Sequence, residues 1–288
     1  MESLGGVQME LMHQQKDFFR TFGFLKFPGL FSDDIERITN TFERIWSDHG
    51  GGHQGNAHDY ERRSALLQFI DQDEYMSGLI DDPRLDGIAS GILGDDYNYV
   101  LSDGNFYVGD TQWHSDYRIP KPSIKAAFYL DEVTAESGAL RVIPGSHMID
   151  DYFSSTLHEI MPSGRETNTQ ELLGIYGDEV PAVALESKPG DLVCFDRRIK
   201  HASFGGSSRR RMFTIVFEPH YEDNELERVH DHIGSLSRFW CDRAYGETMI
   251  RTANPQRMVH LEQRLGNDSH LAELTHKARL DMKEPARG

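Results

Sequence analysis

The amino-acid sequence predicts a mainly β fold with flanking α-helices, in the form of a sandwich or barrel such as a double-sheet jelly roll. Short runs of strand-forming residues, bounded by glycine, proline and aspartate, dominate from about residue 97 onward. Apolar residues recur with helical spacing before and after this region. Many short strands between tight turns are typical of sandwiches and barrels. We expect one domain over 1–288, with an N-terminal helical flank (about 10–95), a lid-like insertion (about 148–180) and a C-terminal helical segment (about 222–288).

The N-terminal flank predicts a helix, a strand and a second helix. Residues 16–22 form the first helix, which we expect to end at Gly23, and residues 24–27 read as a strand that Pro28 stops. Ser32 is the candidate N-cap of the second helix. The apolar stripe of this second helix predicts packing on a sheet, and it consists of Ile35, Ile38, Phe42 and Ile45.

The strand pattern starts where the helical pattern ends. Each run is short and rich in β-branched or aromatic residues, as strands require. The expected strands are 97–101, 105–108, 124–130, 138–143, 183–185, 191–195 and 212–218. A glycine-rich loop at 48–57 precedes them and has His53 and His58 beside it. We interpret it as a mobile loop, with a second metal site as the alternative.

Composition limits the partners of this protein. The formal net charge is −17, with 47 acidic and 30 basic residues, so we expect no binding to nucleic acid or to an anionic membrane surface. No apolar stretch approaches the length of a membrane-spanning helix, and the N-terminus lacks the pattern of a signal peptide. The default expectation is a cytoplasmic protein in which Cys194 is a buried free thiol.

A candidate metal site is formed by His114 and Asp116 together with His201 much further along the chain. Residues i and i+2 of a strand point to the same face, so His114 and Asp116 can reach one ion. Two histidines and one carboxylate suit ferrous iron and leave coordination positions open for a cosubstrate and dioxygen. The same residues could instead form a surface hydrogen-bonded pair or bind zinc in a hydrolase, although the sequence shows no convincing general base for hydrolysis.

Several motifs together resemble the phytanoyl-CoA dioxygenase-like family of iron(II)- and 2-oxoglutarate-dependent oxygenases. The resemblance runs from about residue 15 to 220 and implies a double-stranded β-helix, the cupin-like jelly roll. It also implies that His114, Asp116 and His201 are catalytic iron ligands, with 2-oxoglutarate and dioxygen as cosubstrates. The motifs that carry it are 18–30, 114–116, 138–147, 189–191, and His201 with the arginines that follow it.

The family holds the far carboxylate of 2-oxoglutarate with an arginine on the strand after the second histidine. Alignment with that strand selects Arg210, nine positions after His201 (210 − 201), which is slightly closer than is usual in the family. The choice among Arg209, Arg210 and Arg211 therefore stays open. Arginine suits the task because its planar fork binds a carboxylate through two parallel hydrogen bonds. The other residues assigned to the cosubstrate pocket are Lys125, Gln112, Tyr107 and Thr214.

The resemblance implies hydroxylation of an unactivated C–H bond with release of succinate and carbon dioxide. Residues 117–130 carry three cations and no acid, which favours a small anionic or zwitterionic metabolite as substrate, although solubilising surface lysines would give the same pattern. The alternatives are desaturation, cyclisation or epoxidation of a secondary metabolite, or a non-catalytic jelly roll that binds a metal or ligand. The oligomeric state stays open. The substrate candidates are Arg118, Lys121, Tyr117 and Arg63.

Overall fold

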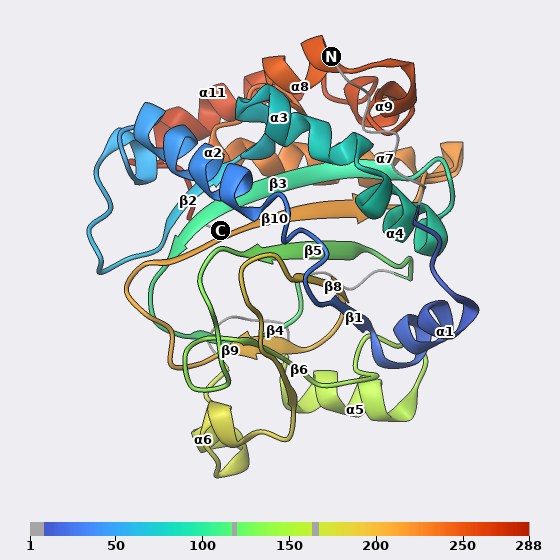
Figure 1. The fold of residues 1–288 in the computed structure, drawn as a ribbon, viewed down its shortest axis with the longest axis vertical. Helices are drawn as coiled ribbons and strands as arrows, with labels where there is room; N and C mark the ends of the chain where they lie inside the picture. Colours follow the sequence, from blue (N-terminus) through green and yellow to red (C-terminus); the bar gives the residue numbers. More distant parts are fainter. Residues whose placement is uncertain (1–8, 117–119, 163–166, 288) are drawn as a thin grey trace.

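Two antiparallel sheets form the centre of the molecule (Figure 1). The computed structural model describes residues 9–116, 120–162 and 167–287, so the predicted substrate residues Tyr117 and Arg118 lie outside the described residues. The six-stranded major sheet has the order β1-β8-β5-β10-β3-β2, and the four-stranded minor sheet has the order β4-β9-β6-β7. The strands are β1 Phe24–Phe27, β2 Ser64–Leu67, β3 Asn98–Tyr107, β4 Thr111–His114, β5 Ile124–Tyr129, β6 Leu140–Val142, β7 Val183–Leu185, β8 Leu192–Asp196, β9 His201–Ser203 and β10 Arg210–Glu218.

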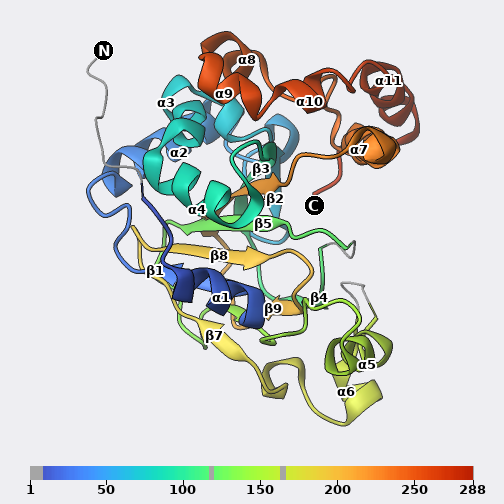
Figure 2. The same cartoon turned by 90° about the vertical axis from the view of Figure 1, so that its right-hand side faces the viewer.

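Helices cover the outer face of the major sheet, with α2, α3 and α8 above it in Figure 1. The minor sheet lies on the opposite side, with α5 and α6 beyond it (Figure 2). The helices are α1 His13–Phe22, α2 Ile35–Asp48, α3 Glu74–Ser77, α4 Pro83–Leu93, α5 Tyr152–Ile160, α6 Thr169–Leu173, α7 Leu226–Gly234, α8 Glu247–Thr252, α9 Pro255–Val259, α10 Glu262–Leu265 and α11 Leu271–Asp281. None of the helices in the described ranges is both long and apolar enough to cross a membrane.

Alternation along the central strands separates the core from the inner face of the major sheet. In β10, Phe213 and Ile215 are buried in one core with Phe42 of α2. Met212 and Thr214, which alternate with them along the strand, line a cavity between the sheets. Successive side chains of a strand point to opposite faces, and each fully buried apolar side chain contributes about 1.5–3 kcal/mol. One strand therefore supplies both the main core and the wall of the cavity.

Most of the expected elements are present, with two corrections. The first helix ends at Gly23, which takes a left-handed conformation at φ 83° and donates its N–H to the carbonyl of Phe19. Ser32 is not the N-cap of the second helix, because α2 begins at Ile35 and Asp34 occupies the cap position. The two strands expected at 97–101 and 105–108 are one continuous strand, β3. Gly104 lies within this strand, and the ring of Phe69 fills the space that a side chain at position 104 would occupy.

The glycine-rich loop is held by its histidines. The two ring nitrogens of His53 lie 3.1 and 2.9 Å from the carbonyl oxygens of Ala65 and Pro285. Those of His58 lie 2.8 Å from Ser64 Oγ and from the carbonyl oxygen of Ser208. Both rings are thus used to anchor the loop, which argues against the alternative of a second metal site. Cys194 and Cys241 are buried free thiols.

Candidate functional site

The three predicted ligands come together between the two sheets. His114 ends β4 and pairs directly with His201, the first residue of β9. Asp116 follows β4, where its backbone N–H donates to the carbonyl of Arg197 at 3.0 Å. Ligand atoms of all three residues lie within 4.8 Å of one another. The pairing of two strands and one backbone hydrogen bond therefore place two imidazoles and a carboxylate around one point.

Hydrogen bonds orient both imidazoles. Nδ1 of His114 donates to the carbonyl of Gln112 at 2.8 Å, and Nδ1 of His201 donates to the carbonyl of Ile199 at 3.0 Å. Their Nε2 atoms point toward Asp116 Oδ1, at 3.5 Å from His114 and 3.7 Å from His201. A hydrogen bond at one ring nitrogen fixes the tautomer that offers the other nitrogen to a metal. Both imidazoles are therefore arranged as ligands.

The electrostatics of the cluster favour the metal-binding protonation states. Burial, together with the neighbouring His114, lowers the pKa of His201 to about 3. Burial alone would raise the pKa of Asp116, but the positive charge of Lys125 holds this pKa well below its usual value. At neutral pH, His201 is a neutral imidazole and Asp116 a carboxylate, which are the forms that bind a cation.

The cluster opens into a cavity of about 630 Å³ between the sheets. A cavity of this size matches those that hold small molecules and cofactors in proteins. The predicted residues Tyr107, Gln112, Lys125, Thr214 and Arg63 all line it together with the cluster. Lys121 is absent from the described lining, because it forms an ion pair with Glu225.

Arg210 is the one of the three candidate arginines that faces the cavity. Its side chain is buried and donates from Nη2 to Ser203 Oγ at 3.2 Å, while Nε and Nη1 have no hydrogen-bond partner among the described residues. Arg209 instead pairs with Glu43, and Arg211 pairs with Glu43 and Asp131. A buried cation with unused donors requires a partner, and a carboxylate matches it.

Gly138 provides the space for this guanidinium. A Cβ atom at position 138 would lie 1.7 Å from Arg210 Nη1, and the residue has a φ of +91°. Gly206 approaches the same atom, with a Cβ at 2.5 Å. Both the conformation and the close approach require glycine at position 138. The pocket for the cation is therefore shaped by backbone from two loops.

Several residues of the cavity were not predicted from the sequence. Asp103 of β3 bonds Arg63 at 2.9 Å and accepts a hydrogen bond from Thr214. Strand alternation could have placed Ser203 beside His201, since these two residues share one face. Nothing local signals the wall formed by α7 and the following 3₁₀ turn Ser235–Phe239. This wall contributes His232, Ser235, Leu236, Arg238 and Phe239.

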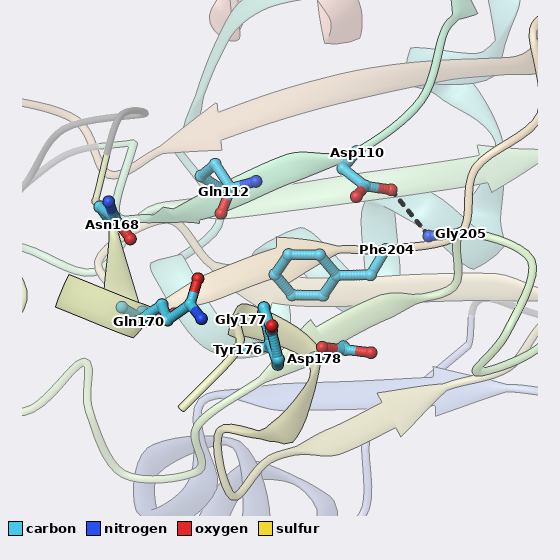
Figure 3. A pocket seen from close by; sticks show the side chains of 10 residues that line it. Asp110, Gln112, Asn168, Gln170, Tyr176, Gly177, Asp178, Phe204 and Gly205 are labelled. Atoms are coloured by element: carbon cyan, nitrogen blue, oxygen red, sulfur yellow. Dashed lines mark hydrogen bonds between the residues drawn. The ribbon is translucent and has the colours of Figure 1, made fainter. Parts of the chain in front are cut away.

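A second cavity, of about 280 Å³, also has Gln112 in its lining (Figure 3). Gln112 and Asp110 line both cavities. The opposite wall belongs to the 148–180 insertion, where Asn168, Gln170 and Asp178 line the space. Trp113 Nε1 donates to the carbonyl of Gly177 at 2.7 Å and so attaches the insertion to the strand that bears His114.

Comparison with known proteins decides the family. The model of the phytanoyl-CoA dioxygenase family (PhyH) matches residues 19–213, which is more than half of the chain. The chain belongs to this family. The resemblance to this family that the sequence motifs indicated is thereby confirmed. The residues of α7 and the 3₁₀ turn that wall the cavity lie beyond the part of the chain that the family model matches.

One curated relative and several solved structures are similar to this chain. Ectoine dioxygenase of Sphingopyxis alaskensis is 30% identical over 163 residues, which cover 49% of this chain and only about half (52%) of that protein. The carbocyclase SnoK from nogalamycin biosynthesis, described as non-heme and alpha-ketoglutarate-dependent, superposes with a TM-score of 0.55 at 20% identity, covering 77% of this chain and 94% of SnoK.

The structure of EctD from S. alaskensis with 2-oxoglutarate and 5-hydroxyectoine gives a TM-score of 0.53 at 23% identity, covering 73% of this chain and 76% of EctD. At these identities the structural likeness shows the fold alone. It confirms the predicted jelly roll with flanking helices. The division of the chain into helical flanks and a lid stays a prediction.

Proposed function

We propose that this protein is an iron(II)- and 2-oxoglutarate-dependent dioxygenase that hydroxylates an unactivated C–H bond of a small anionic or zwitterionic metabolite. One observation carries the proposal: a single cavity contains the His114–Asp116–His201 cluster and the unpaired donors of Arg210. Family membership supports it, as does the presence of iron in one structure of EctD and of 2-oxoglutarate in another.

Each residue of the site has a distinct role in the proposal. His114, Asp116 and His201 hold the iron, which, when bound, supplies the oxidation of the C–H bond with dioxygen and 2-oxoglutarate. Arg210 binds the far carboxylate of 2-oxoglutarate through its guanidinium, of which Nε and Nη1 have no partner among the described residues. Ser203 and the ring of Tyr107, 5.2 Å from the guanidinium carbon, keep this cation in place.

The substrate class follows from the charges of the cavity. Besides Arg210, the lining contains the cations Arg63, Lys125, Arg197 and Arg238. The carboxylates in the lining are Asp103, Asp110 and Asp116, of which Asp116 is assigned to the metal. A metal cation adds further positive charge, so the cavity attracts anions. We therefore assign a metabolite with at least one anionic group, and we assign the insertion around Gly177 as a cover over the mouth of the site.

Anaerobic titration of the iron-loaded protein with 2-oxoglutarate tests this function. We expect the weak visible charge-transfer band of the iron–2-oxoglutarate chelate, and its loss in His201→Ala. Arg210→Ala should raise the Kd for 2-oxoglutarate by about a hundredfold, because it removes two hydrogen bonds to a charged group. Arg211→Ala is the matched control and should titrate like wild type, since its partners are Glu43 and Asp131.

Two outcomes would contradict the proposal. Iron binding without the band would exclude the 2-oxoglutarate role and favour a non-catalytic metal-binding jelly roll. If Arg210→Ala keeps the wild-type Kd for 2-oxoglutarate and Arg211→Ala has a raised Kd, the cosubstrate is bound by Arg211 instead. Once a substrate is found, mass spectrometry of its product distinguishes the gain of one oxygen from desaturation or cyclisation.

A further inference from the structure

The carboxylate of Asp116 faces two different groups with its two oxygens. Oδ1 lies 3.5 and 3.7 Å from the Nε2 atoms of His114 and His201. Oδ2 accepts a hydrogen bond from Lys125 Nζ at 2.7 Å, and Arg197 Nε lies further from the same oxygen, at 4.0 Å. Both side chains are largely buried, with 10% of Asp116 and 19% of Lys125 exposed. One oxygen is therefore directed at the metal position and the other is held by an ammonium group.

Lys125 is fixed in this position by the major sheet. It lies in β5, paired with Phe195 of β8 on one side and Val216 of β10 on the other. Its positive charge also acts on the buried Asp103, which in turn pairs with Arg63 at 2.9 Å. Lys125 therefore lies between two largely buried carboxylates, and movement away from them would leave each with one cationic partner fewer.

We propose that Lys125 is a positioning residue that keeps Oδ2 of Asp116 away from the metal, so that this carboxylate offers a single oxygen. The inference rests on the proposed function. Three protein ligand atoms leave positions for a bidentate 2-oxoglutarate and for dioxygen. A second oxygen from Asp116 would occupy one of these positions and compete with the cosubstrate. Lys125 thus acts through Asp116, whereas the sequence had suggested that it binds 2-oxoglutarate.

Lys125 affects the metal position through its charge as well as through its hydrogen bond to Asp116. Its loss would free Oδ2 to bind the metal and would also remove a cation that repels the metal. We therefore expect no fall in metal affinity from Lys125→Met. The expected changes are in the number of ligand atoms and in the affinity for 2-oxoglutarate. The visible spectrum of a cobalt(II)-substituted protein reports the first, because its bands change in position and intensity when a carboxylate oxygen replaces a water on the metal.

The experiment compares Lys125→Met with Lys125→Arg, and with Lys121→Met as the matched control. Lys121 also forms an ion pair, but with Glu225 rather than with a residue of the cluster. For Lys125→Met we expect a changed cobalt(II) spectrum before 2-oxoglutarate is added, and a Kd for 2-oxoglutarate raised about tenfold or more. Lys125→Arg keeps a cation with N–H donors near Oδ2, so both values should move back toward wild type. Lys121→Met should match wild type.

Three results would overturn the inference. An unchanged cobalt(II) spectrum and Kd in Lys125→Met would show that the contact has no role in ligation. A raised Kd with an unchanged spectrum would mean that Lys125 acts on 2-oxoglutarate directly. If Lys125→Met unfolds more easily without metal, Lys125→Gln provides the same comparison, and a wild-type spectrum in the folded variant would again contradict positioning. A wild-type protein that binds cobalt(II) but no 2-oxoglutarate would contradict the proposed function, while the cobalt(II) spectra would still test the Lys125–Asp116 contact.

Discussion

The two faces of the major sheet differ more than any other neighbouring regions of this protein. On the outer face, Phe128 and Phe213 stack with ring centroids 4.5 Å apart in the core beneath the helices. On the inner face, the same strands place Lys125 and Thr214 in the cavity, and Arg210 lies there with donors unpaired among the described residues. Buried charges contribute little to stability and often reduce it. The outer face therefore carries the larger apolar core, whereas the inner face combines a smaller apolar cluster with the charged groups of the site.

The largest expected effect is on the outer face. Phe213→Ala should lower the free energy of unfolding by about 3–5 kcal/mol, because it removes a fully buried ring and leaves a cavity. Chemical denaturation measures this loss. The Kd for 2-oxoglutarate of the folded variant should stay at the wild-type value. A parallel loss of 2-oxoglutarate binding would show that the two faces are coupled.

A smaller effect is expected at Gly138, whose backbone lies against Arg210 on the inner face. Gly138→Ala places a methyl group on Arg210 Nη1 and should weaken 2-oxoglutarate binding about tenfold or more, since a hydrogen bond to a charged group contributes about 1.5–3 kcal/mol. Gly174→Ala controls for backbone strain alone, because Gly174 also has a positive φ (+74°) but nothing within 4 Å of the added Cβ. Equal affinities in the two variants would refute the role given to Gly138. Isothermal titration with 2-oxoglutarate gives both values.

The smallest expected effect is the pH dependence that His201 of the inner face contributes. The pKa of His201 is lowered from 6.5 to about 3, so below pH 6.5 the unfolded chain binds a proton that the metal-free native state does not. The free energy of unfolding should therefore fall as the pH falls through this range, by up to about 1.4 kcal/mol per pH unit. Urea denaturation of metal-free wild type and His201→Asn at pH 7.5 and 5.5 isolates the effect. An equal fall of the free energy of unfolding in both proteins would contradict the role given to His201.

Local patterns in the sequence were sufficient for much of the fold. The helix end at Gly23 and the apolar stripe of α2 are short-range features, and both are present. The expected division into strands 97–101 and 105–108 was wrong because Phe69, more than thirty residues earlier (104 − 69), packs over Gly104 and makes glycine suitable within a strand. The N-cap at Ser32 was wrong because the helix starts three residues later, at Ile35 (35 − 32).

For the candidate site, the sequence by itself determined the residue types, because His114 and Asp116 lie two residues apart and His201 follows the later strand expected at 191–195. Only the tertiary structure decided which arginine enters the cavity, since Glu43 and Asp131 come from distant segments and hold its two neighbours outside. It also decided that Lys125 meets Asp116 and that a C-terminal helix walls the cavity. The physical reason is common to these cases: the partner of a buried charge is chosen by the packing of the whole chain, which no local pattern contains.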